Sequence, residues 1–230
     1  IDGHDTANKL AILAALAFGM EPGLASVQTE GIRHITPMDV QFADELGCRI
    51  KLLGIARQSG GGIEQYVRPV LISKKSLLAH VNGALNAVLI NGDFSGDIML
   101  EGQGAGADAT ASAIVADIID IARGHRAPVF GVPVAQLKKS TSSQKQSRAR
   151  YYMRLQIMDK AGVLADISAV LRDESISVES FLQRGKPTAG TVPVVLTTHE
   201  CDAAAIRRAV DKMAAIPAVV ERPCLLPMED

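Results

Sequence analysis

The 230-residue sequence contains no tryptophan, and aromatic residues make up only 3% of it. Its formal net charge is −1, so it lacks both the positive charge and the stacking side chains with which proteins bind nucleic acid. The longest uninterrupted apolar run, residues 10–18, has about half the length that a bilayer span requires. We therefore expect neither a nucleic-acid partner nor a membrane span.

Cysteine and histidine are also scarce. Cys48, Cys201 and Cys224 are widely separated and form no CxxC pair, which is typical of unpaired thiols in a reducing cytoplasm. The five histidines are scattered, so we expect no metal site. No basic leader precedes the first apolar run, and we expect a cytoplasmic protein whose length allows two small hydrophobic cores.

The first nineteen residues place an acid and an amine directly before an apolar segment. Asp5 and Lys9 are four residues apart, so both side chains lie on one face if a helix begins at or before Asp5. Residues 10–18 are apolar on every side, which predicts a buried helix that ends at Gly19. Two interpretations stay open: a helix cap with a solvated ion pair worth roughly 0.3 to 0.5 kcal/mol, or a reactive site at the edge of a core.

Periodicity and turn residues predict the elements that follow. Thr36, a proline and Asp39 indicate the start of a short helix that runs to about residue 46. A hairpin is predicted around the glycine-rich turn near residue 60. Two further apolar runs are separated by residues 91–96, in which Asn91-Gly92 is a turn signal. The predicted ranges are strands 49–58, 64–72, 84–90 and 98–101, followed by a helix over 107–122.

The glycine-rich segment after the fourth strand has the spacing Gly102-x-Gly104-x-x-Ala107. This spacing fits a loose dinucleotide fingerprint, but Asp117 and Asp120 fall inside the next helix instead of after a second strand. The segment is therefore not a complete Rossmann unit. It is either a tight strand-to-helix turn or a loop whose backbone approaches a ligand, with Gly102, Gly104, Ala105 and Gly106 as the candidate cofactor-binding residues.

Residues 138–150 are polar and basic, which predicts a linker. Beyond them the predicted order is β-α-β-β-α-β, typical of a ferredoxin-like unit with two helices on one face of a four-stranded sheet. The ranges are strand 151–158, helix 162–171, strands 176–183 and 191–198, helix 202–214 and strand 219–226. We predict an α+β protein, with a mixed-sheet α/β domain followed by this unit.

The string Ile1-x-Gly3-x-Asp5-x-x-x-Lys9 resembles the end of the signature of homoserine dehydrogenases. A second match to that family covers residues 86–117. The resemblance implies an NAD(P)H-dependent interconversion of L-aspartate 4-semialdehyde and L-homoserine, a step toward threonine, methionine and isoleucine. It also implies that Lys9 stabilises or protonates the aldehyde oxygen and that Asp5 orients substrate, lysine or water. Residues 1–137 would be the substrate and dimerisation domain, with a helix near 106–123 that returns to the cofactor domain.

The segment 155–164 resembles the start of ACT regulatory domains, which pair side by side and bind free amino acids. Residues 151–230 would then be an ACT domain that binds a threonine effector through the matching positions Asp159, Gly162, Val163 and Leu164. Asp159 and Gly162 would alternatively serve only to build the turn. A homodimer or homotetramer is implied.

The chain begins inside the signature and without methionine, so we expect a fragment that is inactive by itself. A different class of function, a non-catalytic amino-acid sensor with an ACT unit, stays open. Another ACT-bearing oxidoreductase, such as a phosphoglycerate dehydrogenase, ranks last because that family lacks the Gly-x-Asp-x-x-x-Lys string.

Overall fold

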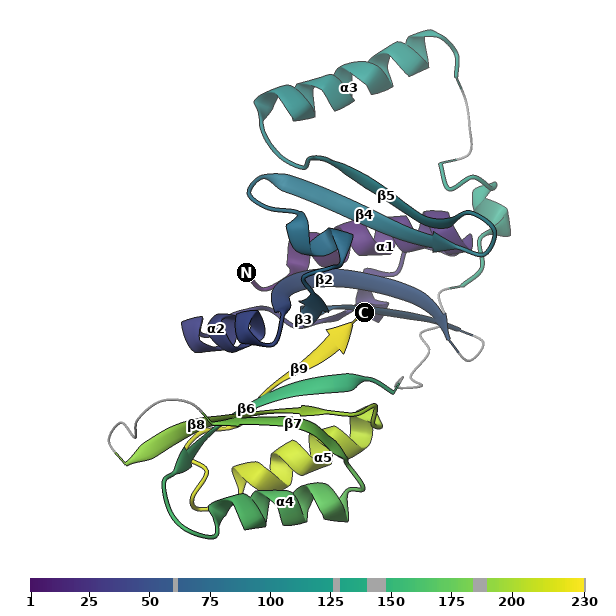
Figure 1. Ribbon diagram of the computed structural model, residues 1–230. Helices are drawn as coiled ribbons and strands as arrows, with labels where there is room; N and C mark the ends of the chain where they lie inside the picture. Colours follow the sequence, from purple (N-terminus) through teal and green to yellow (C-terminus); the bar gives the residue numbers. More distant parts are fainter. Residues whose placement is uncertain (60–61, 126–128, 140–147, 184–189, 230) are drawn as a thin grey trace.

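The computed structural model describes residues 1–59, 62–125, 129–139, 148–183 and 190–229. A seven-stranded mixed sheet runs through the described part, and a separate two-stranded hairpin with one helix lies at the end of the molecule that is uppermost in Figure 1. The prediction of a mixed α/β architecture is confirmed.

We call residues 1–139 the first half of the chain and residues 148–229 the second half. The first half begins with helix α1 (His4–Phe18), the short strand β1 (Gln28–Thr29) and helix α2 (Pro37–Glu45). Strands β2 (Cys48–Ser59) and β3 (Gly62–Ser73) follow as an antiparallel hairpin, as predicted. The 3-10 turn η1 (Leu24–Ser26) lies between α1 and β1, and two further 3-10 turns, η2 (Leu77–His80) and η3 (Val134–Gln136), follow later in the chain. Strand β1 adds to the sheet in parallel with β3.

Helix α1 is less buried than its composition predicts. Its apolar residues contact the sheet on one face, through Ala7, Leu10, Ala11, Ala14 and Ala15. Ile12 and Leu16 on the other faces are 52% and 46% exposed. The prediction of a fully buried helix is therefore wrong for the described residues, because β2 and β3 cover only one side of α1.

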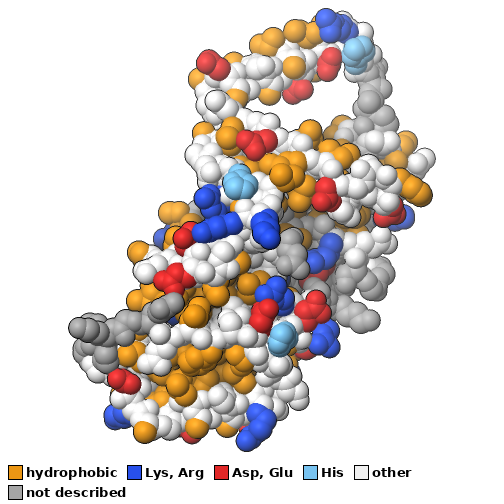
Figure 2. Space-filling view, in the orientation of Figure 1, with side chains coloured by type: hydrophobic (Ala, Val, Ile, Leu, Met, Phe, Trp, Pro, Cys, Tyr) orange, Lys and Arg blue, Asp and Glu red, His pale blue; other side chains and the backbone are white. Residues whose placement is uncertain are grey.

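The second hairpin consists of β4 (Leu85–Gly92) and β5 (Gly96–Gln103), and helix α3 (Ala107–Ala122) follows it at the predicted limits. Figure 2 shows hydrophobic side chains at the surface of this region. The exposed apolar residues are Leu85, Leu89, Ile90, Phe94, Ile98 and Leu100 on the hairpin and Ile114, Val115, Ile118, Ile119 and Ile121 on α3. A monomer rarely exposes so many apolar side chains together, so this region has the character of an interface.

The second half has the predicted order β-α-β-β-α-β: β6 (Arg150–Met158), α4 (Val163–Asp173), β7 (Val178–Gln183), β8 (Thr191–Thr198), α5 (Ala203–Ala214) and β9 (Cys224–Glu229). Its strands lie in the order β9-β6-β8-β7, with α4 and α5 together on one face (Figure 1). The last strand begins at Cys224 instead of residue 219. Val219 makes only an isolated bridge to Ile157, and Pro223 lacks the N–H that a ladder needs.

Strand β9 joins the two halves into one sheet. Its outer edge pairs in parallel with β3, with Leu71 opposite Met228 and Ile72 opposite Glu229. Its other edge pairs with β6. Because β9 begins at Cys224 and not at residue 219 as predicted, it extends to Glu229, and its last two residues pair with β3.

Two hydrophobic clusters cover the two faces of the sheet in its second half. Met153 and Leu155 on one face pack with Ile206 and Met213 of α5. Tyr152 and Leu226 on the other face pack with Phe42 of α2 and other residues of the first half. Each fully buried side chain of this size contributes roughly 1.5 to 3 kcal/mol, so the second cluster binds the halves together.

The predicted linker over 138–150 lies partly outside the described residues. Lys138 pairs with Met20 in an isolated parallel bridge, and Ala149 pairs with Cys201. The described ends of the segment are therefore each attached to one of the two halves.

Candidate active site and its surroundings

The Asp5 and Lys9 side chains lie together on the first turns of α1. The Lys9 Nζ atom is 2.8 Å from the Asp5 Oδ2 atom, and the two side chains are 52% and 83% exposed. This confirms that a helix begins before Asp5 and places both groups on one face. An exposed pair of this kind adds little to stability, and both groups are accessible to a small molecule.

Glycines position the helix that carries this pair. Gly3, the residue before α1, has a φ of 84°, a backbone conformation in which a side chain is strained. A Cβ atom on Gly54 of β2 would lie 3.1 Å from Thr6 Cγ2 and 3.4 Å from Leu10 Cβ. The missing side chain at Gly54 therefore lets α1 lie close against the strand.

An ion pair fixes the segment that leads into α1. The Arg33 guanidinium donates two hydrogen bonds to Asp2, with Nε and Nη2 at 2.6 Å and 2.8 Å from the two carboxylate oxygens. These bonds lower the pKa of Asp2. The backbone N–H of Ile32 also donates to the carbonyl of Ile1, so residues 1 and 2 are held by the chain that follows β1.

The glycine-rich loop lies between β5 and α3. Gly106 is the residue before α3, and no side chain caps the free N–H groups of that helix. A Cβ atom on Gly104 would lie 2.0 Å from Asn86 Nδ2, so a larger residue there would force the exposed Asn86 side chain to move. Because β5 belongs to an antiparallel hairpin, this loop is not the turn of a Rossmann unit.

The third group of predicted residues lies at the turn between β6 and α4. Gly162 precedes α4 with a φ of 94°, and the Asp159 N–H donates to the carbonyl of Gly190. Val163 is buried in the core, whereas Leu164 is 37% exposed. Helices α3 and α4 lie at opposite ends of the molecule, so the structure does not bring these residues and the glycine-rich loop together (Figure 1).

Comparison with known proteins identifies the family. The family model described as homoserine dehydrogenase matches residues 1–119, which contain the Asp5 and Lys9 pair and the glycine-rich loop. The chain belongs to the homoserine dehydrogenase family.

Its relatives in this family extend the match over the whole chain. The homoserine dehydrogenase of Neisseria gonorrhoeae is 39% identical and that of Helicobacter pylori 35%, each covering 100% of the chain and 54% of the relative. The crystal structure of a homoserine dehydrogenase from Thiobacillus denitrificans superposes with a TM-score of 0.88 at 41% identity, again over 100% of this chain and 54% of that one. The chain thus spans about half the length of the curated homoserine dehydrogenases that it matches.

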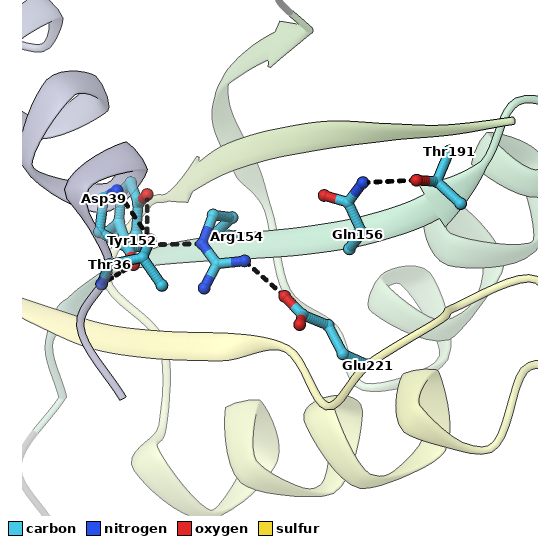
Figure 3. A network of polar contacts seen from close by, with 7 residues as sticks. All are labelled: Thr36, Asp39, Tyr152, Arg154, Gln156, Thr191 and Glu221. Atoms are coloured by element: carbon cyan, nitrogen blue, oxygen red, sulfur yellow. Dashed lines mark hydrogen bonds and ion pairs between the residues drawn. The ribbon is translucent and has the colours of Figure 1, made fainter. Parts of the chain in front are cut away.

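A buried polar network, which the sequence did not reveal, joins the two halves of this family member (Figure 3). Asp39 of α2 is fully buried. Its Oδ1 atom accepts hydrogen bonds from the Tyr152 hydroxyl at 3.0 Å and from Arg154 Nε at 2.7 Å. Its Oδ2 atom accepts from the backbone N–H and the hydroxyl of Thr36, at 2.8 Å and 2.7 Å.

Arg154 links this carboxylate to a second acid. Its Nη1 atom donates to Glu221 at 2.6 Å, so one guanidinium contacts a residue of α2 and a residue that precedes β9. Burial alone would raise the pKa of Asp39, but the hydrogen bonds from Arg154 and Thr36 outweigh it and hold that pKa below its usual value. The Thr36-Pro37-x-Asp39 capping box was visible in the sequence, but its partners on β6 were not.

Among the residues that the structure describes, no group of three or more His, Cys, Asp and Glu side chains is arranged to hold a metal ion. Over the same residues, no helix is long and apolar enough to cross a membrane.

Proposed function

We propose that this chain supplies the substrate-binding and catalytic side chains of a homoserine dehydrogenase, which interconverts L-homoserine and L-aspartate 4-semialdehyde. The observation that carries the proposal is the Lys9 and Asp5 pair, 2.8 Å apart on α1, inside the segment that matches the family. Family membership favours this enzyme over the alternative of a non-catalytic amino-acid sensor.

The proposed chemistry follows from the charge that develops on the substrate. Hydride addition to the aldehyde carbon builds negative charge on its oxygen, and a positioned cation or proton donor lowers that barrier. The Lys9 ammonium is the group of α1 suited to this task, and it would protonate the oxygen as the alcohol forms. Asp5 holds the Lys9 ammonium by the ion pair and orients it or a bound water.

The hydride would come from NAD(P)H. The loop of Gly102, Gly104, Ala105 and Gly106 would contact this cofactor through its backbone. The loop ends in free N–H groups at the start of α3, and its glycines let a ligand approach the backbone. Asp108 lies in the first turn of α3 and would repel a phosphate. We therefore place the loop beside the uncharged nicotinamide end of the cofactor and not at its pyrophosphate.

The test is the substitution Lys9→Ala in the full-length enzyme. We expect kcat to fall by at least about a hundredfold, the lower end of the effect of a general acid, with the fold unchanged. The matched control is Lys74→Ala, because Lys74 forms a comparable surface ion pair with Asp44 at 2.6 Å. Near-normal turnover by Lys9→Ala would show that the Asp5 and Lys9 ion pair has only a structural role.

The 230 residues alone should not oxidise NADPH in the presence of the aldehyde. The described residues contain no complete nucleotide-binding unit, and the chain spans about half of its relatives. Aldehyde-dependent NADPH oxidation by the purified chain would contradict this expectation.

We further propose that residues 151–230 are an ACT domain with a ferredoxin-like fold, that residues 1–137 are the substrate and dimerisation domain, and that residues 138–150 connect them. The strand order β9-β6-β8-β7 with two helices on one face supports the ferredoxin-like assignment. Threonine would bind at Asp159, Gly162, Val163 and Leu164 and inhibit the enzyme. If Asp159→Asn leaves threonine inhibition unchanged, Asp159 only builds the turn.

The remaining parts of the proposal concern the whole enzyme. It would act in the cytoplasm, in threonine, methionine and isoleucine biosynthesis, as a homodimer or homotetramer. The exposed apolar side chains of β4, β5 and α3 support assembly through that region.

A further inference from the structure

A small pocket lies where the first half of the sheet meets helix α5. Its volume is about 200 Å³. It is lined by Gln28, Thr29, Glu30, Tyr66, Val67, Arg68 and Arg207. Val67 packs against α1 on one face of the sheet, and Tyr66 and Arg68 alternate with it, so their side chains lie on the other face. The pocket is therefore on the side of the sheet that faces away from α1.

Two arginines from different halves of the chain line this pocket. Arg68 comes from β3 and Arg207 from α5. Within the described parts of the chain, neither has a carboxylate within ion-pair distance. By contrast, Arg208, the next residue on α5, pairs with Glu174 at 2.8 Å.

Arg68 is held in place although it lacks an acidic partner. Its guanidinium lies over the Tyr66 ring, 3.9 Å from the ring centre. The Tyr66 hydroxyl donates to Glu229 at 2.8 Å, which fixes the ring in turn. The Arg68 Nε atom is buried and has no hydrogen-bond partner. A buried donor without a partner is costly, and an anion in the pocket would satisfy it.

The electrostatics of the pocket favour a negative ligand. Burial raises the pKa of the nearby Tyr151, while the positive charges of Arg68 and Arg207 both act to lower it. Both guanidinium groups are therefore close enough to act electrostatically on the same side chain. Glu30 is the acid among the lining residues, and its carboxylate lies 3.5 Å from His34 Nε2. Two arginines against one acid leave a net positive lining.

We propose that this pocket binds a small anion, a carboxylate or a phosphate, between Arg68 of β3 and Arg207 of α5. Both groups match the planar, multiple N–H donors of guanidinium. The volume is below the roughly 300 to 1,000 Å³ of pockets for drug-sized ligands, so the ligand is small. Because the two arginines belong to different halves, the bound anion stabilises their junction.

The experiment uses the full-length protein and two probes, inorganic phosphate and malonate, titrated calorimetrically at constant ionic strength with chloride as the reference salt. We expect saturable binding of at least one probe. Each of the variants Arg68→Gln and Arg207→Gln should weaken it by about tenfold or more, since a lost hydrogen bond to a charged group is worth roughly 1.5 to 3 kcal/mol. The preferred probe tells a carboxylate site from a phosphate site.

The control variant is Arg208→Gln, which removes an arginine of the same helix that already has an acidic partner. It should bind the probes as the unmodified protein does. Arg207 lies on an exposed helix surface and glutamine is a good helix former, so Arg207→Gln is expected to fold. Absence of saturable binding, or equal affinity in all four proteins, would overturn the proposal.

Discussion

Asp39 is a buried carboxylate, and each of its two oxygens accepts two hydrogen bonds. The donors are Thr36, the N-cap of α2, and Tyr152 and Arg154 of β6. Its ion pair with Arg154 is largely removed from water, with the two side chains 0% and 8% exposed. Breaking such a pair by removing one partner leaves an uncompensated charge and costs about 3 to 5 kcal/mol. The network therefore matters more for stability than the exposed ion pairs of this chain.

We predict that Asp39→Asn lowers the free energy of unfolding by about 3 kcal/mol or more, measured by urea denaturation near neutral pH. Asp44→Asn, which breaks an exposed pair with Lys74, should change it by less than about 1 kcal/mol. Similar losses in the two variants would contradict the assignment of the network.

The same pair predicts a dependence on pH. The folded pKa of Asp39 is lowered, so its contribution to stability is present above the unfolded value near 3.8 and is lost as pH falls through the folded value. The difference between the unmodified protein and Asp39→Asn should therefore shrink in acid.

The three tyrosines of the chain provide a second prediction, at alkaline pH. Burial raises the pKa of Tyr66 to about 12, with Glu229 adding to the shift, and burial also raises the pKa values of Tyr151 and Tyr152. Absorbance titration of the folded chain should show less phenolate near pH 10 than the unfolded chain does, because free tyrosine ionises there. Because these folded pKa values are raised, stability is full below pH 10 and falls as pH rises above it. A normal phenolate titration in the folded protein would count against this packing.

At the level of whole elements, the start of helix α1 lies close against β1 and β3 because Gly3, the residue before it, has no side chain. A Cβ atom on Gly3 would lie 3.0 Å from Thr29 Cγ2 and 3.1 Å from Val67 Cγ1, and the φ of 84° is itself unfavourable for other residues. A side chain there would strain the start of the helix and push it away from β1 and β3. Asp5 and Lys9, two to six residues later, would move with it.

Gly3→Ala should therefore reduce stability by about 1 to 2 kcal/mol from backbone strain, with a further loss from contact. Gly19→Ala at the other end of α1 is the matched control, because its φ is 60° but nothing lies within 4 Å of the added carbon. In the full-length enzyme, only Gly3→Ala should also reduce kcat. Equal effects of the two substitutions on stability and kcat would show that the contact of the added carbon at position 3 with Thr29 and Val67 has no consequence.

On the scale of the whole molecule, β9 connects two halves that are separate in sequence. Its parallel pairing with β3 is short, and Glu229 at its end also contacts Arg57 and Tyr66 of the first half. The Asp39 network and the cluster around Tyr152 add contacts on the face that α2 covers. We expect the seven-stranded sheet to unfold as one unit.

Removal of the last three residues should weaken the coupling of the halves, because it removes the pairing of β9 with β3 and leaves the Asp39 network and the Tyr152 cluster in place. Hydrogen exchange followed by mass spectrometry should then show lost protection in β3, while β6 and β8 retain theirs. Glu229→Gln keeps the backbone pairing and removes only the charge, so it should retain most of the protection. If the truncated chain keeps full protection in β3, β9 does not couple the halves.

Much of the secondary structure could be predicted because its signals are local. The capping box at Thr36 and the glycine before α4 each act over a few residues, and the structure confirms the helices that they precede. The predicted Asn91-Gly92 turn is wrong in detail: both residues belong to β4 and pair with Asp97 and Gly96, and the turn lies at residues 93–95. Helix α3 and strand β8 match their predicted limits. The assignment of Asp5 and Lys9 to a site came from a family motif, and their catalytic roles stay a prediction.

The sequence by itself determined that Asp5 and Lys9 share one face of a helix, because a separation of four residues is set by helix geometry. Periodicity and turn chemistry also determined the order of the longer strands and helices, but not the two-residue strand β1. Only the tertiary structure decided which face of α1 is buried, how β9 reaches β3, and that Arg154 meets Asp39 across 115 positions. Such contacts depend on how distant elements pack, and no local spacing along the chain encodes them.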